Sequence, residues 1–277
     1  MSGAQAAERA PARTLPRPDH VVIVVEENRA YSRIIGNMAA QYINSLANRG
    51  ALFTQSYAVA HPSQPNYLAL FSGSTHNITD NSCPHTLAGD NLANSLLRAG
   101  LTFGIYSESM PSAGYAGCEY GHYQRKHNPA VNWQGVNVPP SANQPFSGFS
   151  RDFSKLPTVS MVAPNQENDM HNGAELDAIL RGDAWLRTHL DAYVRWAETH
   201  NSLLIVTWDE DDGSENNRIA TIFVGPMVRK GVYARRIDHY DVLRTILEMY
   251  SLPPLGRSAN ARTIDEIWDR TPSRGGK

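Results

Sequence analysis

Long apolar segments are missing from this sequence of 277 residues. The longest uninterrupted aliphatic run extends only from Val21 to Val25, whereas a helix needs about 20 apolar residues to cross a bilayer. We therefore expect no transmembrane segment.

An excess of positive charge is missing as well. The 25 Lys and Arg residues are balanced by 27 Asp and Glu residues, so the net charge is −2 with histidine neutral. Proteins that bind the phosphate backbone of nucleic acids carry clustered Lys and Arg, and we therefore expect no nucleic-acid partner. The apolar fraction of 41% is that of a folded chain, and the length fits one large α/β domain.

Cysteine is scarce, since Cys83 and Cys118 are the only two. Two isolated thiols are often unpaired in a cytosolic protein. A disulfide is favoured here because no CxxC motif is present and because closing a loop of about 36 residues would stabilise the fold by roughly 3 to 4 kcal/mol. This interpretation indicates a secreted or periplasmic protein, while residues 1–18 lack the apolar core of a signal peptide.

Five β-rich runs indicate the core of a sheet. They do not alternate between apolar and polar residues, as is typical of strands buried on both faces. The runs are residues 20–25, 102–106, 158–162, 202–207 and 220–224.

Helical patterns lie between and after these runs. Apolar residues from Leu186 to Ala197 recur at helical spacing behind a possible N-cap at Asp183, and a second pattern from Leu243 to Tyr250 stops before a proline pair. Strands that alternate with helices predict a three-layer α/β/α sandwich with a mostly parallel central sheet.

The remaining segments complete the expected domain organisation. Residues 1–18 and 271–277 are predicted to be a flexible arm and a flexible tail around one domain, residues 19–270. Residues 107–153 are long, aromatic and rich in Gly, Pro and Asn. Because a loop of that size usually has a function, we interpret it as a cap over the site.

Polar groups follow four of the predicted strands. Ligands of open α/β sheets bind outside the carboxyl ends of the strands, although any one such segment could be an ordinary solvated loop. Carboxylates that converge there repel one another unless a cation lies among them, and oxygen ligands suit Mg²⁺, Ca²⁺ or Mn²⁺. The four segments are Glu26-Glu27-Asn28, Ser107-Glu108, residues 165–171 (NQENDMH) and Asp209-Glu210-Asp211-Asp212.

A second signal lies in the segment from His61 to Gly73. Ser63 stands where a helix should begin, and Gly73 follows its expected end. Ser63 could simply be an N-cap. A helix start is also an anion site, and a serine that faces a carboxylate-bound cation is a plausible nucleophile for phosphoryl transfer.

These residues resemble the alkaline phosphatase superfamily. The segment Ser63-Gln-Pro-Asn66-Tyr67, followed by Leu70-Phe-Ser-Gly73, is similar to its nucleophile helix. A narrower resemblance, to the bacterial acid phosphatase and phospholipase C phosphoesterase family, covers roughly residues 19–255. It rests on Glu27-Asn28, on Val206-Thr-Trp-Asp-Glu210 and on Asp238-His-Tyr-Asp-Val-Leu-Arg-Thr-Ile-Leu-Glu248 followed by Ser251-Leu-Pro.

The resemblance implies a set of site residues. Ser63 would be the nucleophile, Asn66 would bind a phosphoryl oxygen, and His127 and His171 would act on the phosphate or the leaving alcohol. The implied metal ligands are Glu27, Asn28, Asp209 and Glu210, and Asp169 is implied as a further pocket residue that binds substrate. Arg125 and Lys126 are candidate substrate-binding cations, because a site that prefers monoesters needs extra positive charge. His239 is a candidate substrate-binding residue that could equally cap the helix that follows.

The chain departs from the two-zinc members of the superfamily. Asp209 is followed by Glu210 rather than by histidine, and no HxxxH spacing occurs. We therefore expect one oxygen-rich site for a divalent metal (Mg, Ca, Mn or Zn), with Asp169, His171 and His239 as supporting groups or ligands of a second metal.

The expected function is metal-dependent hydrolysis of phosphate monoesters, of the acid phosphatase type, through a phosphoserine intermediate. The substrate would be a small-molecule or lipid phosphate ester. The alternatives are a phospholipase C-like or other phosphodiesterase and a non-catalytic protein that binds metal or phosphate. No particular oligomeric state is predicted.

Overall fold

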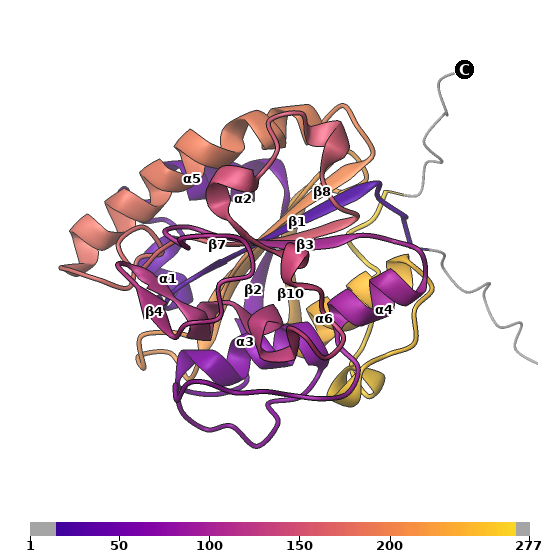
Figure 1. Ribbon diagram of the computed structural model, residues 1–277. Helices are drawn as coiled ribbons and strands as arrows, with labels where there is room; N and C mark the ends of the chain where they lie inside the picture. Colours follow the sequence, from indigo (N-terminus) through magenta and orange to yellow (C-terminus); the bar gives the residue numbers. More distant parts are fainter. Residues whose placement is uncertain (1–14, 270–277) are drawn as a thin grey trace, which may run out of the picture.

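The computed structural model describes residues 15–269, which form three layers (Figure 1). The middle layer is an eight-stranded sheet in the order β10-β2-β9-β8-β1-β7-β3-β6. β9 runs antiparallel to both of its neighbours, and the other neighbouring pairs are parallel. The strands of this sheet are β1 (His20–Glu26), β2 (Ala51–Tyr57), β3 (Phe103–Ser107), β6 (Asn143–Pro145), β7 (Val159–Ala163), β8 (Ser202–Trp208), β9 (Arg218–Val224) and β10 (Gly231–Asp238).

Helices cover both faces of the sheet. One face carries α1 (Tyr31–Ile34), α2 (Gln41–Arg49) and α5 (Glu175–Ala197), and the other carries α3 (Ser63–Ser72), α4 (Leu92–Arg98) and α6 (His239–Met249) (Figure 1). The predicted α/β/α sandwich is thus confirmed. Short 3-10 helices are η1 (Arg125–His127), η2 (Pro129–Trp133), η3 (Pro140–Ala142), η4 (Phe146–Gly148), η5 (Phe153–Lys155) and η6 (Gly256–Ala259).

The central strand β1 shows why the apolar runs were informative. Val21, Ile23 and Val25 pack into the core on the α3 face, whereas Val22 and Val24 pack into the core on the α5 face. Successive side chains of a strand point to opposite faces, so a strand covered on both sides needs an unbroken apolar run. The five predicted strands are confirmed, with ends that differ by one or two residues.

The N-cap predicted at Asp183 is wrong. α5 begins at Glu175, and Asp183 is a buried residue inside this helix. Its carboxylate accepts hydrogen bonds from the backbone N–H groups of Tyr42 (3.0 Å) and Ile43 (2.8 Å). Asp183 therefore caps α2, a different helix, which has no capping side chain of its own.

The predicted boundary of the N-terminal arm at residue 18 is also wrong. Leu15 packs against the core, Arg17 lies over the Tyr250 ring at 5.3 Å, and the Tyr250 hydroxyl donates to the Pro18 carbonyl. Residues 15–18 therefore belong to the folded domain. The rest of the predicted arm, residues 1–14, and the predicted tail lie outside the described residues.

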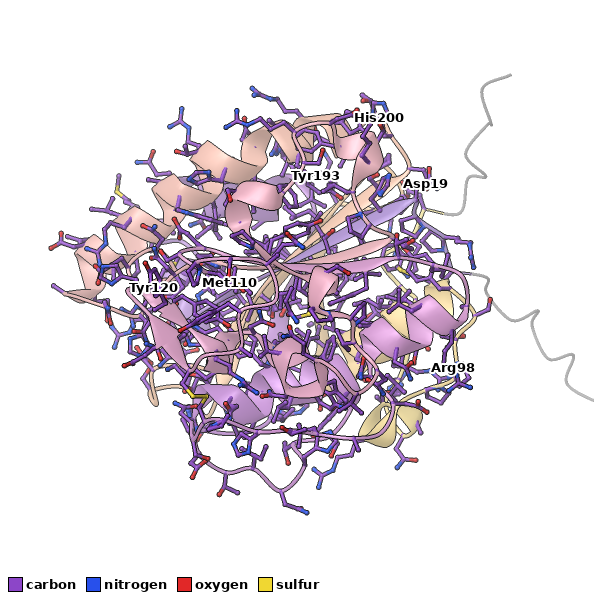
Figure 2. The ribbon with its side chains drawn as sticks, in the orientation of Figure 1. Asp19, Arg98, Met110, Tyr120, Tyr193 and His200 are labelled. Carbon is purple, nitrogen blue, oxygen red and sulfur yellow. A yellow bond between two sulfur atoms is a disulfide. The ribbon has the colours of Figure 1, made fainter. Side chains whose placement is uncertain are left out.

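The predicted cap, residues 107–153, contains a small hairpin of β4 (Glu119–Tyr120) and β5 (Tyr123–Gln124), as well as the edge strand β6. Figure 2 shows Tyr120 of this hairpin near the end of the molecule that carries α1. The predicted disulfide is confirmed, since Cys83 and Cys118 are bonded with their Cα atoms 5.8 Å apart. Among residues 15–269, no helix has the length and apolar character needed to span a membrane.

Candidate active site

The site lies where the parallel strands β8, β1, β7 and β3 end side by side. α3 begins beside these ends, with Ser63 as its first residue after the N-cap Pro62. The helix ends at Gly73 in the left-handed conformation (φ 72°), as the sequence predicted. The strand ends and the start of α3 thus meet at one edge of the sheet.

Ser63 faces two carboxylates. Its hydroxyl is buried and lies 3.1 Å from Glu27 Oε2 and 3.0 Å from Glu210 Oε1, both within hydrogen-bond distance. It makes no capping bond to the helix backbone. A serine that served only as an N-cap would donate or accept within its own helix, so the structure does not support that alternative.

The other oxygen of Glu27 is held from the opposite side. The Tyr67 hydroxyl donates to Glu27 Oε1 (2.6 Å), and His127 Nε2 lies 3.1 Å from the same oxygen. The Tyr67 and His127 rings are stacked, with centroids 5.3 Å apart. This packing fixes the direction in which Glu27 presents its free oxygen to Ser63.

Asn28 links Glu27 to Asp209. Its backbone N–H donates to Asp209 Oδ1 (3.2 Å), and one terminal atom of its amide lies 3.1 Å from Glu27 Oε2 and 3.2 Å from Asp209 Oδ1. Its φ of 45° is left-handed, a conformation that asparagine tolerates better than most residues. Arg29 donates to the Asn28 carbonyl (2.7 Å) and so supports this turn.

A second polar group joins Asp169 to His127. Asp169 Oδ2 lies 3.5 Å from His127 Nδ1 and accepts no hydrogen bond from the described residues. Glu27, His127 and Asp169 each place a ligand-type atom within 4.8 Å of the others, and all three are buried. These three residues therefore form a group that could hold a metal ion.

The pKa values of the carboxyl groups follow from their crowding. Burial, and then the charges of Glu27 and Glu210, raise the pKa of Asp209 well above its ordinary value. Burial and the charge of Glu27 likewise raise the pKa of Asp169. Burial alone would raise the pKa of Glu27 too, but His127, Lys126 and Tyr67 together lower it to about 2. Several acids thus compete for few positive partners, which favours an added cation.

Asn66 and His239, two of the predicted site residues, bond to backbone groups of the protein. Asn66 accepts hydrogen bonds from the N–H groups of Val59 and Ala60 and donates to the carbonyls of Ala60 and Pro62. It holds the loop before Ser63, so contact with a phosphoryl oxygen would require it to give up one of these bonds. The ring of His239 is buried against the Asp209 carbonyl (2.9 Å), and burial lowers its pKa to about 4.

Arg125 does not lie where a substrate-binding cation would. Its guanidinium is buried and donates to the carbonyls of His85 and Ala116 and to Asn132 Oδ1, which clasps the two segments joined by the disulfide. These contacts give the guanidinium a structural role and do not support the predicted substrate role of Arg125. Lys126 is partly exposed, forms no ion pair within residues 15–269, and lowers the pKa of Glu27 by its charge.

His171 lies at the edge of the site. Its backbone N–H donates to Asp169 Oδ1 (2.9 Å), and its partly buried ring lies 3.0 Å from Asn172 Oδ1 through Nδ1. The start of α3 is less open than the sequence suggested, because the Gln64 N–H already donates to Asn81 Oδ1 (3.0 Å). The N-terminal amides of α3 are therefore a weaker anion site than predicted.

The sequence interpretation missed His61 and Tyr67. Both belong to the segment that identified Ser63, but neither was given a role. His61 Nδ1 is hydrogen-bonded to Glu210 Oε2, and His61 Nε2 lies 3.3 Å from Asp211 Oδ1. The signals were the position of His61 two residues before Ser63 and of Tyr67 one helical turn after it.

Solved structures share the fold at low sequence identity. A protein of the alkaline phosphatase superfamily from Vibrio parahaemolyticus aligns with a TM-score of 0.63 at 14% identity, over 93% of this chain and 72% of that one. A phosphonate monoester hydrolase from Silicibacter pomeroyi aligns with a TM-score of 0.61 at 10% identity, over 89% and 76%. The fold is therefore that of the alkaline phosphatase superfamily.

Relatives in sequence are phosphatases. The chain is 52% identical over 260 residues to a phosphatidylinositol-3-phosphatase from Mycobacterium tuberculosis, covering 93% of this chain and 85% of the relative. It is 30% identical over 241 residues to an acid phosphatase from Aspergillus fumigatus, covering 80% of this chain and 53% of the relative. The chain therefore spans about half the length of that fungal protein.

The family model named Phosphoesterase family matches residues 37–253, a range that includes Ser63, Asp209 and Glu210 but begins after Glu27. With the fold, the phosphatase relatives and the buried serine among carboxylates, this match shows that the chain belongs to the Phosphoesterase family and is a phosphoric ester hydrolase.

Proposed function

We propose that this enzyme hydrolyses phosphate monoesters through a phosphoserine intermediate on Ser63, with a divalent metal ion bound by Glu27, Asn28, Asp209 and Glu210. One observation carries the proposal: the Ser63 hydroxyl lies within hydrogen-bond distance of two buried carboxylates at the start of a helix. A serine oxygen in this position has acceptors for its proton and lies at the edge of the sheet where ligands bind.

The residues fit a hard cation. One amide atom of Asn28 lies 3.1 Å from a carboxylate oxygen of Glu27 and 3.2 Å from one of Asp209. An amide nitrogen in this position donates to both carboxylates, whereas an amide oxygen there would share a bound cation with them. Asp169 Oδ2 is buried without a hydrogen bond from the described residues, so Glu27, His127 and Asp169 offer an additional metal-binding group beside the first. A bound divalent ion would supply positive charge that favours the serine alkoxide and offsets the charge of the phosphate.

The proton and bond changes follow from the contacts of Ser63. In the first step, Oγ attacks phosphorus in line, its proton passes to Glu210 or Glu27, and the bond from phosphorus to the alcohol oxygen breaks. His171 lies at the edge of the site with Nε2 available to protonate the leaving oxygen. Water then attacks the phosphoserine from the opposite side and gives a proton to His171, while the proton held by the carboxylate returns to the serine oxygen as phosphate leaves.

Lys126 supports the choice of a monoester. A monoester carries more negative charge on its terminal phosphoryl group than a diester does, so a site that prefers it needs an additional cation. Lys126 is such a cation, since its charge acts on Glu27 and Asp169 and it forms no close ion pair within residues 15–269. The similarity to a phosphatidylinositol-3-phosphatase supports a lipid phosphate monoester as one substrate, and the disulfide supports a location outside the cytoplasm.

The test is the variant Ser63→Ala. We expect the hydrolysis of p-nitrophenyl phosphate to fall by at least about 10³-fold, as is typical when a nucleophile is removed. The thermal midpoint should change little, because Ser63 makes no capping bond. Acid quenching of the wild-type enzyme during turnover, followed by mass spectrometry, should place a phosphoryl group on Ser63. Activity of Ser63→Ala within tenfold of wild type would overturn the proposal.

A further inference from the structure

His61 is the polar side chain beside the nucleophile that the proposed mechanism leaves without a role. Its ring bridges two acids, with Nδ1 on Glu210 Oε2 and Nε2 3.3 Å from Asp211 Oδ1. The ring is half exposed (49%), whereas both carboxylates are buried. A half-exposed ring adds little to the core, so its function must be sought in these two contacts.

We propose that His61 is a positioning residue, which holds the Glu210 carboxylate so that its Oε1 atom faces the Ser63 hydroxyl. The proposal rests on the function proposed above. The two oxygens of a carboxylate lie in one plane, so fixing Oε2 on His61 also fixes where Oε1 points. Oε1 is the atom that lies 3.0 Å from Ser63 Oγ.

The far side of His61 is anchored by backbone. The Asp211 carboxylate accepts hydrogen bonds from the N–H groups of Gly213 (2.7 Å), Glu215 (2.7 Å) and Asn217 (3.1 Å). Three backbone donors leave this buried carboxylate little freedom to move. Asp211 therefore offers the His61 imidazole a carboxylate oxygen in a fixed position.

Asn217 ties the same turn to the chain just before His61. Its Nδ2 donates to the Ala60 carbonyl (2.7 Å), its Oδ1 accepts from the Asp211 N–H (3.0 Å), and its own carbonyl accepts from the Ala58 N–H (2.9 Å). The backbone next to His61 and the ring of His61 are thus held by one turn, residues 211–217. A continuous series of polar contacts runs from this turn through His61 and Glu210 to Ser63.

Glu210 needs such support because other acids surround it. Glu27 also lies within hydrogen-bond distance of Ser63, and Asp209 is the adjacent residue. Repulsion between these charges would turn a free carboxylate away from the serine. The bond to His61 opposes that rotation.

A set of three variants tests the proposal. His61→Ala removes both contacts, His61→Asn keeps an N–H close to the position of Nδ1, and His200→Ala serves as the control, because His200 is an exposed histidine after α5 that contacts Thr199 and Trp196. We expect His61→Ala to lower kcat about 10- to 100-fold, the usual effect of losing a group that orients an active-site ligand, with KM changed less than about threefold. His61→Asn should recover most of the loss, and His200→Ala should match wild type.

The choice of substrate separates positioning from proton donation. Each enzyme is assayed with p-nitrophenyl phosphate, whose leaving group needs no proton, and with an alkyl phosphate, whose leaving group does. A positioning role predicts the same fold-loss on both substrates. A loss confined to the alkyl phosphate would overturn the proposal and make His61 the proton donor, and kcat within about threefold of wild type on both would also overturn it.

The two proposals fail in different ways. If Ser63→Ala remains active, the function proposed for the site is wrong. If Ser63→Ala is inactive while His61→Ala behaves like wild type, only the role of His61 is wrong. Thermal midpoints of all the variants, expected to lie close to that of wild type, show that the comparison is made between folded proteins.

Discussion

The two faces of the sheet bury acidic side chains in opposite ways. On the α5 face, both oxygens of the Asp183 carboxylate accept hydrogen bonds from the backbone of α2. On the α3 face, Glu27, Asp209 and Glu210 lie close together, and their partners are mostly side chains such as Ser63 and Tyr67. Burial alone therefore does not separate a structural acid from a functional one.

The hydrogen-bond partners of a buried acid show whether its role is structural or functional. Backbone N–H groups are fixed by the fold, so the carboxylate of Asp183 can only hold α2 in place. Side-chain hydroxyls and imidazoles can exchange protons, and clustered carboxylates repel one another unless a cation lies among them. Asp183 thus serves the stability of α2, whereas the carboxylates around Ser63 suit the proposed chemistry. Four measurements test this contrast.

The largest effect is expected at Glu27. Glu27→Gln keeps the size of the side chain but removes its charge. We expect activity to fall about 10³-fold, because metal binding is weakened and the Ser63 hydroxyl loses one of its two carboxylate neighbours. The free energy of unfolding should stay within about 1 kcal/mol, since the substitution also removes repulsion from Asp209.

The metal content of Glu27→Gln shows whether its loss of activity comes from weaker metal binding. Elemental analysis should find metal in the wild type and less in Glu27→Gln, and a chelator should inactivate the wild type until metal is restored. Full activity in protein verified to be free of metal would show that the carboxylates around Ser63 do not act by binding a metal ion.

The next largest effect is expected at the disulfide on the α3 face. The double variant Cys83→Ser and Cys118→Ser should lose about 3 kcal/mol of unfolding free energy, because the cross-link no longer restricts the unfolded chain. Denaturant unfolding with and without reductant measures this loss. If the variant and the wild type are equally stable, the hydrogen bonds from Arg125 to the carbonyls of His85 and Ala116 are sufficient to hold the two segments together.

A substitution at Asp183 should lower stability and leave activity unchanged, the opposite of the result expected for Glu27. Asp183→Ala leaves two buried N–H groups at the start of α2 without acceptors, and we expect a loss of about 2 kcal/mol in unfolding free energy. The kcat per folded molecule should not change, because Asp183 lies on the other face from Ser63. A fall in kcat at unchanged stability would mean that the two faces are coupled.

The smallest effect is expected at Lys126. Lys126→Gln should reduce the ratio of kcat/KM for a phosphate monoester over a matched diester by about tenfold, since one positive charge near the phosphoryl group is lost. Arg125→Gln is the matched control, and it should lower stability rather than this ratio because its guanidinium is bound to carbonyls. A wild-type enzyme that prefers the diester would instead favour the phosphodiesterase interpretation.

The sequence predicted those parts of the fold that depend on local pattern. Buried parallel strands need continuous aliphatic runs, so β1 and β8 were visible. β10 was missed because it is an edge strand that alternates between partly buried and exposed residues and includes two arginines. Ser63 was found because helix starts have a local signature.

The errors concern contacts between distant segments. Asp183 was interpreted as the cap of its own helix because its partner, α2, lies about 140 positions earlier in the chain. Arg125 was counted as a free cation because nothing in the sequence shows that the carbonyls of His85 and Ala116 surround it. The role proposed for His61 depends in the same way on Glu210, which is 149 positions away.

The position of Ser63 between β1 and β8 has a consequence for how activity arises during folding. Its two carboxylate partners lie 36 and 147 positions away in the sequence, one after each of two neighbouring strands. Contacts of such separation form late, because the loops between them must close first. A refolding chain can therefore regain helix and compactness before the nucleophile has its surroundings, and catalysis should be among the last native properties to return.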